Sequence, residues 1–579
     1  MRIKLHQTQH TLADFEGVLS YLKSIPVEKE KTLHLFPELF LTGYPLKDLC
    51  LTRPFIEAYE FFLEEVRSWA ASRKESEVFL MGGLEYKKDG KGIPQHIKNV
   101  IWCAEKGNIS SVYSKRLLPN YDIFDEKKYF SAGTENTILT IHGLKVGLLI
   151  CEDMWPSTTH DFDPGKSLHQ ELKNKNESLD LLINLSASPF NIGKLDKRIA
   201  RATELSRAFA APFIYVNRVG AEDEVLFDGQ SFVAEDLDIV IQAKAFTATV
   251  LEYVAEKNKK SLSTYDVKEE NTWESLFEIS LTKQKALPRV KSLSHEELAE
   301  VKQALEFGLQ EYASKTGFKK FTVALSGGID SALVLTLARL SLKKGQSLEA
   351  IYMPSQYSAT LSYELSNALC TSLGVPLYSL PIKFYHATMK NNFNDIFGSP
   401  LEGLANENIQ SRLRGALLYT RSNMTDSLVI NTSNKSELAV GYSTLYGDSV
   451  GALSLIGDLY KTEVFDLARY LNVLHPGLIP MGIIDRAPSA ELRENQKDED
   501  SLPPYERLDA ILEGILSYRL SFKEMAKMGF EEKELKKVFL LYAKSEYKRY
   551  QFCPILKIKA KSFGFGYRIP ITKDHKFYY

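Results

Sequence analysis

The stretch Ser326-Gly327-Gly328-Ile329-Asp330-Ser331 decides the fold of the second half of this 579-residue chain. It lies between two apolar runs, residues 321–325 and 332–340, and this order predicts a strand, a glycine-rich turn and a helix. Adjacent glycines let backbone N–H groups curve around an anion, and the helix N-terminus and serine hydroxyls add further donors. No Gly-Lys-Ser/Thr follows, so the stretch is not a Walker loop. It predicts a pyrophosphate cradle; the alternative is an ordinary strand-to-helix turn.

Length and composition limit the class of protein. A single hydrophobic core usually stops growing near about 250–300 residues, so we expect more than one domain. The formal net charge of -2 gives no reason to expect a nucleic acid or membrane partner. The opening MRIKLHQTQH is not an apolar signal segment, and no apolar run approaches the ~20 residues that span a bilayer. Five scattered cysteines lack paired metal spacing, so we expect no disulfide scaffold or zinc site and a cytoplasmic location.

The chain divides into two halves with different patterns. Residues 1–265 contain recurring short strand candidates, and helix-like stretches lie between several of them, as at 53–71 and 197–210. Residues 266–294 are more charged and are predicted to be a connector. From 295 to 579 strands and helices alternate, as in a doubly wound α/β sheet. The predicted strands are 32–36, 78–81, 99–103, 146–150, 181–185 and 213–216, then 321–325, 348–353, 376–380 and 428–431.

Three residues of the first half lie just after predicted strands or shortly before a Leu-Pro pair that ends regular structure. Cys151 directly follows the apolar run 145–150, a good position for a nucleophile, although a lone cysteine is more often a buried structural residue. Glu38 follows the strand at 32–36, and Lys115 precedes a Leu-Pro stop. Taken singly, both would more often be surface charges.

Together, Glu38, Lys115 and Cys151 resemble the Glu–Lys–Cys triad of the nitrilase (carbon–nitrogen hydrolase) superfamily, over most of residues 1–265. The resemblance implies an N-terminal α-β-β-α sandwich that hydrolyses an amide. In this reading Glu38 takes the thiol proton, Cys151 attacks the carbonyl and Lys115 stabilises the oxyanion. Ammonia leaves from the thioester intermediate, and Glu38 then activates the water that releases the acid.

Within this superfamily the likeness is greatest to glutaminase domains. Residues 185–190, LSASPF, and the pair Gly193-Lys194 resemble a loop that holds glutamine. The resemblance implies that Ser188 and Lys194 grip the amino-acid end and that Tyr121 shapes the pocket, although the Ser-Ala-Ser-Pro stretch could be only a turn. Arg218 departs from the pattern, because we expect an uncharged polar residue there.

In the second half the glycine-rich turn resembles the PP-loop of ATP pyrophosphatases, which adenylate their substrates. The segments NTSNKSE at 431–437, LYKT at 459–462 and APSAEL at 487–492 resemble the NAD synthetase family in the right order. The resemblance implies a Rossmann-like doubly wound parallel sheet. It also implies that ATP adenylates the carboxylate of deamido-NAD (nicotinic acid adenine dinucleotide) with release of pyrophosphate, and that ammonia from glutamine then converts the adenylate to NAD and AMP.

The family pattern assigns roles to single residues. Asp330 and Glu437 are candidate Mg²⁺ ligands, because hard oxygen ligands suit this ion; Glu437 could instead only pair with Lys435 or Lys461. For Arg412 and Arg414, a solvated helix face is as good a reading as a substrate or subunit contact. The predicted ATP contacts are Ser326, Gly327, Gly328, Ile329, Asp330, Ser331, Thr432 and Lys461. The predicted deamido-NAD contacts are Asn408, Glu437, Tyr442, Asp448 and Lys557.

The family resemblance also implies an ammonia tunnel and a homo-oligomer, built from dimers of synthetase domains and possibly a homo-octamer. Two other functions remain open. The chain could be an amidotransferase with a different adenylated acceptor, or the first half could be a degenerate scaffold beside an enzyme fed by free ammonia. The charged stretch 494–500 is predicted to be an exposed loop that could close over the second site.

Overall fold

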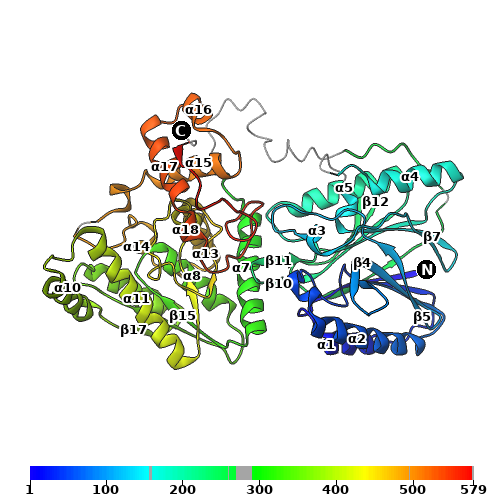
Figure 1. Cartoon of the computed structure of the whole chain (residues 1–579), viewed down its shortest axis with the longest axis horizontal. Coiled ribbons are helices and arrows are strands. Elements are labelled where there is room, and N and C mark those ends of the chain that lie inside the picture. The colour runs from blue at the N-terminus through cyan, green and yellow to red at the C-terminus, as the bar shows by residue number, and fades with distance from the viewer. Residues whose placement is uncertain (156–159, 259, 269–289, 495, 577–579) are drawn as a thin grey trace. The chain divides into compact units, whose positions relative to one another are not determined.

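The computed structural model describes residues 1–155, 160–258, 260–268, 290–494 and 496–576 (Figure 1). Two compact units follow each other along the chain, Met1–Ser275 and Leu276–Tyr579. Most of the predicted connector, residues 269–289, lies outside the described residues, so its boundaries stay a prediction. Among the described residues, no helix combines the length and apolar character needed to cross a membrane.

The first unit contains two six-stranded sheets, in the orders β14-β1-β2-β3-β4-β5 and β13-β12-β9-β8-β7-β6. The first sheet comprises β1 (Arg2–Gln7), β2 (Thr32–Leu35), β3 (Glu77–Lys88), β4 (Pro94–Glu105), β5 (Asn108–Ser114) and β14 (Thr249–Val254). The second comprises β6 (Ile138–Ile141), β7 (Leu144–Ile150), β8 (Leu181–Ser186), β9 (Phe213–Asn217), β12 (Phe232–Glu235) and β13 (Asp238–Gln242). A hairpin of β10 (Val219–Glu222) and β11 (Val225–Asp228) completes the strands.

The two sheets pack face to face through alternate apolar side chains. Leu5 and Leu35 of the first sheet join Val146, Leu148 and Ile183 of the second in one buried cluster. Helices cover the two outer faces: α1 (Phe15–Ser24) and α2 (Arg53–Ala71) on the first sheet, and α4 (Pro164–Lys175) and α5 (Lys194–Phe209) on the second (Figure 1). Short helices η1 (Lys47–Leu51), α3 (Glu126–Tyr129) and η2 (Cys151–Met154) lie in connections. This is the expected α-β-β-α sandwich.

The second unit is built on a parallel five-stranded sheet of order β17-β16-β15-β18-β19. Its strands are β15 (Lys320–Ala324), β16 (Ser347–Tyr352), β17 (Leu377–Ser379), β18 (Leu428–Asn431) and β19 (Leu453–Ser454). The strand order reverses between β15 and β18, and open parallel sheets bind ligands beyond the strand ends at such a point. The expected Rossmann-like doubly wound sheet is therefore present.

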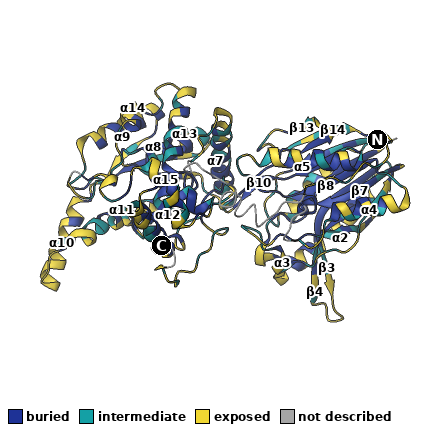
Figure 2. Cartoon of the chain, turned by 90° about the horizontal axis from the view of Figure 1, so that it is seen from above, coloured by how far each residue is buried: buried dark blue, intermediate teal, exposed yellow. Residues whose placement is uncertain are grey.

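Helices surround this sheet and add a C-terminal cluster. The main ones are α7 (His295–Thr316), α8 (Ile329–Ser341), α9 (Thr360–Leu373), α10 (Lys383–Phe397), α11 (Gly403–Thr425), α12 (Lys435–Val440) and α13 (Lys461–Leu474). The others are α14 (Met481–Ile484), η3 (Asp498–Asp500), α15 (Tyr505–Leu516), α16 (Phe522–Lys527), α17 (Glu532–Lys544) and α18 (Glu546–Arg549). Within α10, His386 is the buried residue, and Figure 2 shows the rest of this helix largely exposed.

Two candidate active sites

The three residues of the predicted triad lie beyond the ends of three strands of the first unit. Glu38 lies in the turn after β2, Lys115 directly follows β5, and Cys151 begins η2 directly after β7. All three side chains are buried. The backbone of Cys151 is left-handed, with φ of 43°, and its N–H donates to Asn184 Oδ1 at 2.9 Å. The strands of both sheets thus bring the triad together in the interior.

Lys115 contacts two carboxylates. Its Nζ lies 2.7 Å from Glu38 Oε1 and 2.8 Å from Glu126 Oε1, and Tyr44 OH also donates to Glu126 Oε1 at 3.0 Å. Glu126 is a residue of this centre that the sequence analysis did not predict. It lies in a charged segment, residues 122–128, where nothing in the pattern distinguishes it from a surface carboxylate.

Burial and charge set the protonation states at this site. Desolvation, opposed by Lys115 and supported by Glu38, raises the pKa of Glu126 to about 7. Desolvation alone would lower the pKa of Lys115, but Glu126 and Glu38 raise it well above its ordinary value, so Lys115 is cationic. Desolvation and the charge of Glu38 raise the pKa of Cys151 well above its usual range. Cys151 is therefore a thiol at neutral pH, and a base is needed to make the nucleophile.

Glu38 is held from three sides. Asn99 Nδ2 donates to Oε1 at 2.7 Å, and the N–H of Ala187 donates to Oε2 at 2.9 Å. Gly82 of β3 packs directly against the backbone of the turn that carries Glu38, because a Cβ at Gly82 would lie 2.4 Å from both Leu39 N and Pro37 O. The carboxylate therefore has a fixed position next to Lys115.

The predicted glutamine contacts flank this centre. Tyr121 is half-exposed, and its OH donates to the carboxylate of Glu152 at 3.0 and 3.1 Å. Glu152 directly follows Cys151 and was not predicted. Lys194 begins α5 and places Nζ 4.5 Å from the ring centroid of Trp155.

Ser188 is buried and held by an ion pair of α5 and β11. Arg198 donates from Nε to Ser188 Oγ at 3.2 Å and from Nη2 to the carbonyls of Ser188 and Pro189, both at 2.9 Å. Its Nη1 contacts both carboxylate oxygens of Asp228, at 2.9 and 2.8 Å. A buried charge needs such a partner, so this pair fixes the loop after β8.

Arg218, which departs from the expected pattern, is accommodated by a partner of its own. Its Nη2 lies 2.6 Å from Glu222 Oε1 and 3.1 Å from the carbonyl of His10, and Nη1 donates to the carbonyl of Tyr44. Because Tyr44 donates to Glu126, this arginine supports the site indirectly.

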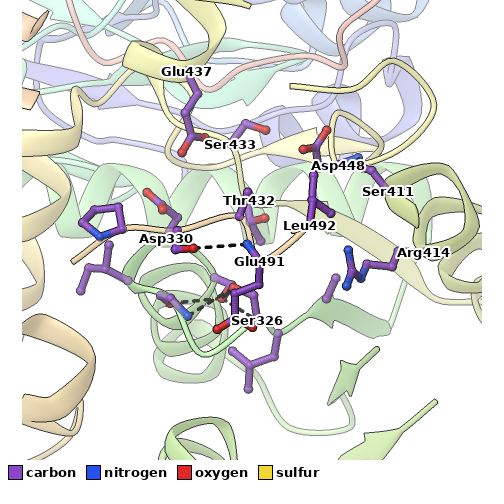
Figure 3. Close-up of a pocket in the computed structure, with 18 of the residues that line it drawn as sticks. Ser326, Asp330, Ser411, Arg414, Thr432, Ser433, Glu437, Asp448, Glu491 and Leu492 are labelled. Atoms are coloured by element: carbon purple, nitrogen blue, oxygen red, sulfur yellow. Dashed lines mark hydrogen bonds between the residues drawn. The ribbon is translucent and has the colours of Figure 1, made fainter. Parts of the chain in front are cut away.

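The second unit has a cavity of about 250 Å³ at the reversal point of its sheet. Figure 3 shows side chains from the glycine-rich turn, from the loop after β18 and from α11 converging on it. Of the predicted contacts, Ser326, Gly328, Ile329, Asp330, Ser331, Thr432, Glu437, Tyr442, Asp448 and Lys461 line this cavity.

The glycine-rich turn is closed by its own serines. Ser331 Oγ lies 3.1 Å from Ser326 Oγ and accepts from Ser326 N at 3.2 Å, and Gly328 N donates to Ser326 Oγ at 3.2 Å. Gly328 is the N-cap of α8. Gly327 has φ of +80°, and a Cβ there would lie 2.5 Å from the carbonyl oxygen of Ser362, so the turn requires glycine.

One buried cation joins the carboxylates of the cavity. Lys461 forms a hydrogen-bonded ion pair with Asp330 Oδ2, and its Nζ lies 3.6 Å from Glu437 Oε1. Asn434 Nδ2 donates to Asp330 Oδ1 at 2.9 Å. Desolvation and Asp330 raise the pKa of Glu437 to about 8, although Lys461 opposes the shift. Among the described residues, no group of three or more His, Cys, Asp or Glu side chains forms a metal cage.

The pairing of Glu437 also distinguishes the two lysines considered for it. Lys435 Nζ lies 2.9 Å from Asp458 Oδ1 instead, and this pair is buried away from the cavity lining. Of these two lysines, Glu437 therefore contacts only Lys461.

Asp498 was not predicted as part of the site. The sequence analysis expected residues 494–500 to form an exposed loop, but Asp498 is buried and lines the cavity. Tyr505 OH donates to its Oδ2 at 2.9 Å, and Tyr442 OH donates to its Oδ1 at 3.3 Å. The exposed-loop expectation is wrong at this residue, because hydrogen bonds from two partly buried tyrosines offset the cost of burying its charge.

Three of the predicted contacts, Gly327, Asn408 and Lys557, are not in the cavity lining, and the two arginines whose role was left open differ from each other. Arg414 lines the cavity and donates from Nε to the carbonyl of Met353 at 2.9 Å, whereas Arg412 is exposed. Asn408 is not in the lining and accepts from Thr444 Oγ1 at 2.9 Å. Lys557 also lies outside the lining, and its Nζ donates to the carbonyls of residues 559 and 560 at 2.8 and 2.9 Å.

Comparison with known proteins agrees with both halves. Residues 5–255 match the family model described as carbon-nitrogen hydrolase, and residues 301–552 match the one described as NAD synthase. The chain is 37% identical to a glutamine-dependent NAD(+) synthetase of Synechocystis, over 93% of this chain and 92% of that protein. It is 34% identical to one of Aquifex aeolicus, over 99% of both chains. The chain belongs to the glutamine-dependent NAD(+) synthetase family.

A solved structure extends this similarity. A glutamine-dependent NAD+ synthetase of Acinetobacter baumannii, in complex with adenosine diphosphate, has a TM-score of 0.69 and 29% identity over 98% of both chains. As a member of the glutamine-dependent NAD(+) synthetase family, the chain is an enzyme that amidates deamido-NAD to NAD with nitrogen from glutamine.

Proposed function

We propose that the first site is the glutaminase and that Glu38, Lys115 and Cys151 are its catalytic residues. Glu38 takes the thiol proton of Cys151, and Sγ attacks the side-chain amide carbon of glutamine. Lys115 stabilises the oxyanion. The proton passes from Glu38 to the leaving nitrogen, which departs as ammonia, and Glu38 then activates water to release glutamate from the thioester. The high pKa of the Cys151 thiol supports this order, because the thiolate forms only with a base at hand.

Glutamine is bound in this proposal by Tyr121, Ser188 and Lys194. Ser188 and Lys194 flank the loop that also donates to Glu38, so substrate and base share one support. Glu126 keeps Lys115 charged and directed at the centre.

The second site adenylates and amidates deamido-NAD. ATP lies on the turn formed by residues 326–331, with Thr432 and Lys461, where backbone N–H groups and a helix N-terminus favour phosphate. The carboxylate of deamido-NAD attacks the α-phosphate and pyrophosphate leaves. Ammonia then attacks the adenylate, and NAD and AMP are released. Tyr442, Asp448 and Glu437 are contacts of the dinucleotide. Arg414 lines the cavity but Asn408 and Lys557 do not, so Arg414 is favoured over them as a further dinucleotide contact.

Asp330 and Glu437 would hold Mg²⁺. Both carboxylates line the cavity, and Mg²⁺ needs only one or two protein carboxylates when substrate phosphates supply further oxygens. A bound Mg²⁺ would offset the charge of the triphosphate. Lys461, which contacts both carboxylates, neutralises the departing pyrophosphate.

We also propose that the protein is a homo-oligomer that pairs through its second unit. Phe384, Ile396 and Phe397 of α10 are 70%, 73% and 66% exposed, which is an unusual density of apolar side chains on one helix. Leu404 and Met424, at the two ends of α11, are also 72% and 73% exposed. An octamer of such dimers, a cytoplasmic location and domain limits of 1–265 and 295–579 stay predictions.

The deciding experiment measures NAD formation from deamido-NAD, ATP and Mg²⁺ with either glutamine or ammonium. Wild type is expected to use both donors, and Cys151→Ala to use only ammonium. Absence of NAD with either donor would mean that the acceptor is another carboxylate. Glutamine use by Cys151→Ala would remove the first site from the mechanism.

A further inference from the structure

A buried carboxylate next to the nucleophile has no place in the chemistry proposed above. Asp153 lies two residues after Cys151, inside η2, and its side chain is fully buried. Desolvation raises its pKa to about 6, against the opposing hydrogen bonds of two backbone amides. Burying a carboxylate is costly unless donors surround it, so its partners indicate what it does.

Four donors converge on Asp153, and they come from two segments. Oδ1 accepts from the N–H groups of Arg116 and Leu117, at 3.0 and 2.8 Å. Oδ2 accepts from the N–H of Ile150 at 3.0 Å and from Tyr113 OH at 2.9 Å. The first segment surrounds Lys115 in sequence, and Ile150 directly precedes Cys151.

We propose that Asp153 is a positioning residue that ties the backbone carrying Lys115 to the backbone carrying Cys151. Lys115 directly follows β5 of one sheet and Cys151 directly follows β7 of the other, and one carboxylate spans the gap between these strand ends. Only an acceptor with two oxygens, each taking two hydrogen bonds, satisfies this arrangement. The inference rests on the proposed glutaminase role of the first site.

The chemistry of the side chain predicts the effect of Asp153→Asn. An amide has one acceptor oxygen, so its NH₂ group must face two of the four donors. Displacement of a catalytic group by about 1 Å can cost about 100-fold in rate, and we expect a fall of this size in kcat for glutamate release and glutamine-dependent NAD formation. The KM for glutamine should change much less, because Asp153 accepts no hydrogen bond from Tyr121, Ser188 or Lys194.

A buried carboxylate at the other end of β7 provides a matched control. Asp180 is also buried and accepts two backbone N–H groups, from Lys145 at 2.7 Å and Asn258 at 2.6 Å. Lys145 lies at the opposite end of β7 from Cys151. Asp180→Asn therefore removes a comparable buried carboxylate without touching the catalytic segments.

The experiment uses full-length wild type, Asp153→Asn and Asp180→Asn, each with a melting temperature and with ammonium-dependent NAD formation as the control for the second site. The proposal requires a selective loss of glutamine-dependent kcat in Asp153→Asn while Asp180→Asn, similarly destabilised, keeps it. Equal losses in both variants, or normal kcat in Asp153→Asn, overturn it.

If Asp153→Asn does not fold, Tyr113→Phe decides. This variant removes only the hydroxyl donor and keeps the buried ring. A lowered glutamine-dependent kcat with an unchanged melting temperature supports the proposal, and a wild-type kcat overturns it.

Discussion

The contact of Lys115 with Glu38 and Glu126 places one buried cation against two buried carboxylates. Desolvation is the main cause of the raised pKa of Glu126, and the nearby charge of Glu38 raises it further, although Lys115 opposes both effects. The sequence analysis named Lys115 and Glu38 because each stands beside an apolar strand or stop. It could not name Glu126, because burial of this residue depends on a tertiary contact with Tyr44 and not on any local pattern.

This arrangement gives a pH-dependent stability. The pKa of Glu126 is about 7 in the folded protein and 4.5 in its ordinary state, so between these values the folded state binds a proton that the unfolded state releases. Stability from this residue is therefore full below pH 4.5 and is lost as pH rises through 7, by about 3 kcal/mol in total. Glu126→Gln carries no such proton.

Melting temperatures of wild type and Glu126→Gln between pH 5 and 8 test this. We expect the wild-type curve to fall relative to the variant as pH rises. Other groups that titrate here, including Glu437, are common to both proteins and cancel in the difference. Parallel curves would contradict the assignment.

The packing of Gly82 against the turn of Glu38 leads to a second prediction. Gly82→Ala places a Cβ against backbone atoms of residues 37–39, which must move and carry the general base with them. We expect glutamine-dependent NAD formation to fall about 100-fold while ammonium-dependent formation is kept. Gly90→Ala, with open space around its Cβ, is the control. Equal kinetics of both variants would show that the turn tolerates the methyl group.

At the level of secondary structure, the strand patterns located most of the framework of both sites, but not β5, the strand that Lys115 follows. All ten predicted strands coincide with observed strands to within a few residues where both are short, because apolar runs bounded by turn residues report buried strands directly. The longer strands β3 and β4 were found only within their buried parts, since the last residues of β3 and the first residues of β4 are exposed and polar. Nine of the described strands were not predicted: β1, β5, β6, β10, β11, β12, β13, β14 and β19. In β1 and β14, polar residues alternate or mix with apolar ones, as they do in half-buried strands.

The glycine-rich turn between β15 and α8 is an element whose shape is testable. Gly327→Ala combines a left-handed backbone with a contact of 2.5 Å to Ser362. We expect loss of NAD formation with both nitrogen donors. Gly317, at the end of α7, has nearly the same φ, +84°, but open space, so Gly317→Ala carries the same backbone strain of about 1–2 kcal/mol without the clash. Activity of Gly327→Ala equal to that of Gly317→Ala would exclude steric closure of the turn.

At the scale of the whole molecule, each unit has its own core and its own candidate site. The sequence motifs predicted both sites in outline because they lie at strand ends, where the local pattern and the tertiary location coincide. They could not predict Asp498 or Arg198, which reach their sites from a charged stretch and from the face of a helix. Lys557 shows the reverse case: a motif position whose side chain contacts its own loop.

The exposed apolar side chains of α10 lead to a prediction about assembly. We expect a double substitution of Ile396 and Phe397 by Asp to lower the mass of the particle in light scattering, because charges would be buried at the proposed contact. Phe61→Asp on α2, where Phe61 is also 70% exposed, should leave the mass unchanged. An unchanged mass in the double variant would place the contact elsewhere.

The left-handed backbone of Cys151 has a consequence for how this protein can evolve. A non-glycine residue at φ of 43° costs about 1–3 kcal/mol, and glycine would relieve that cost. The nucleophile is thus held at a position where the fold itself favours a residue without a side chain. Selection for thermal stability alone would tend to replace Cys151 by glycine, and the use of glutamine as nitrogen source is what keeps the thiol. In a lineage supplied with abundant ammonium, the single substitution Cys151→Gly would relieve the backbone cost and give a more stable protein.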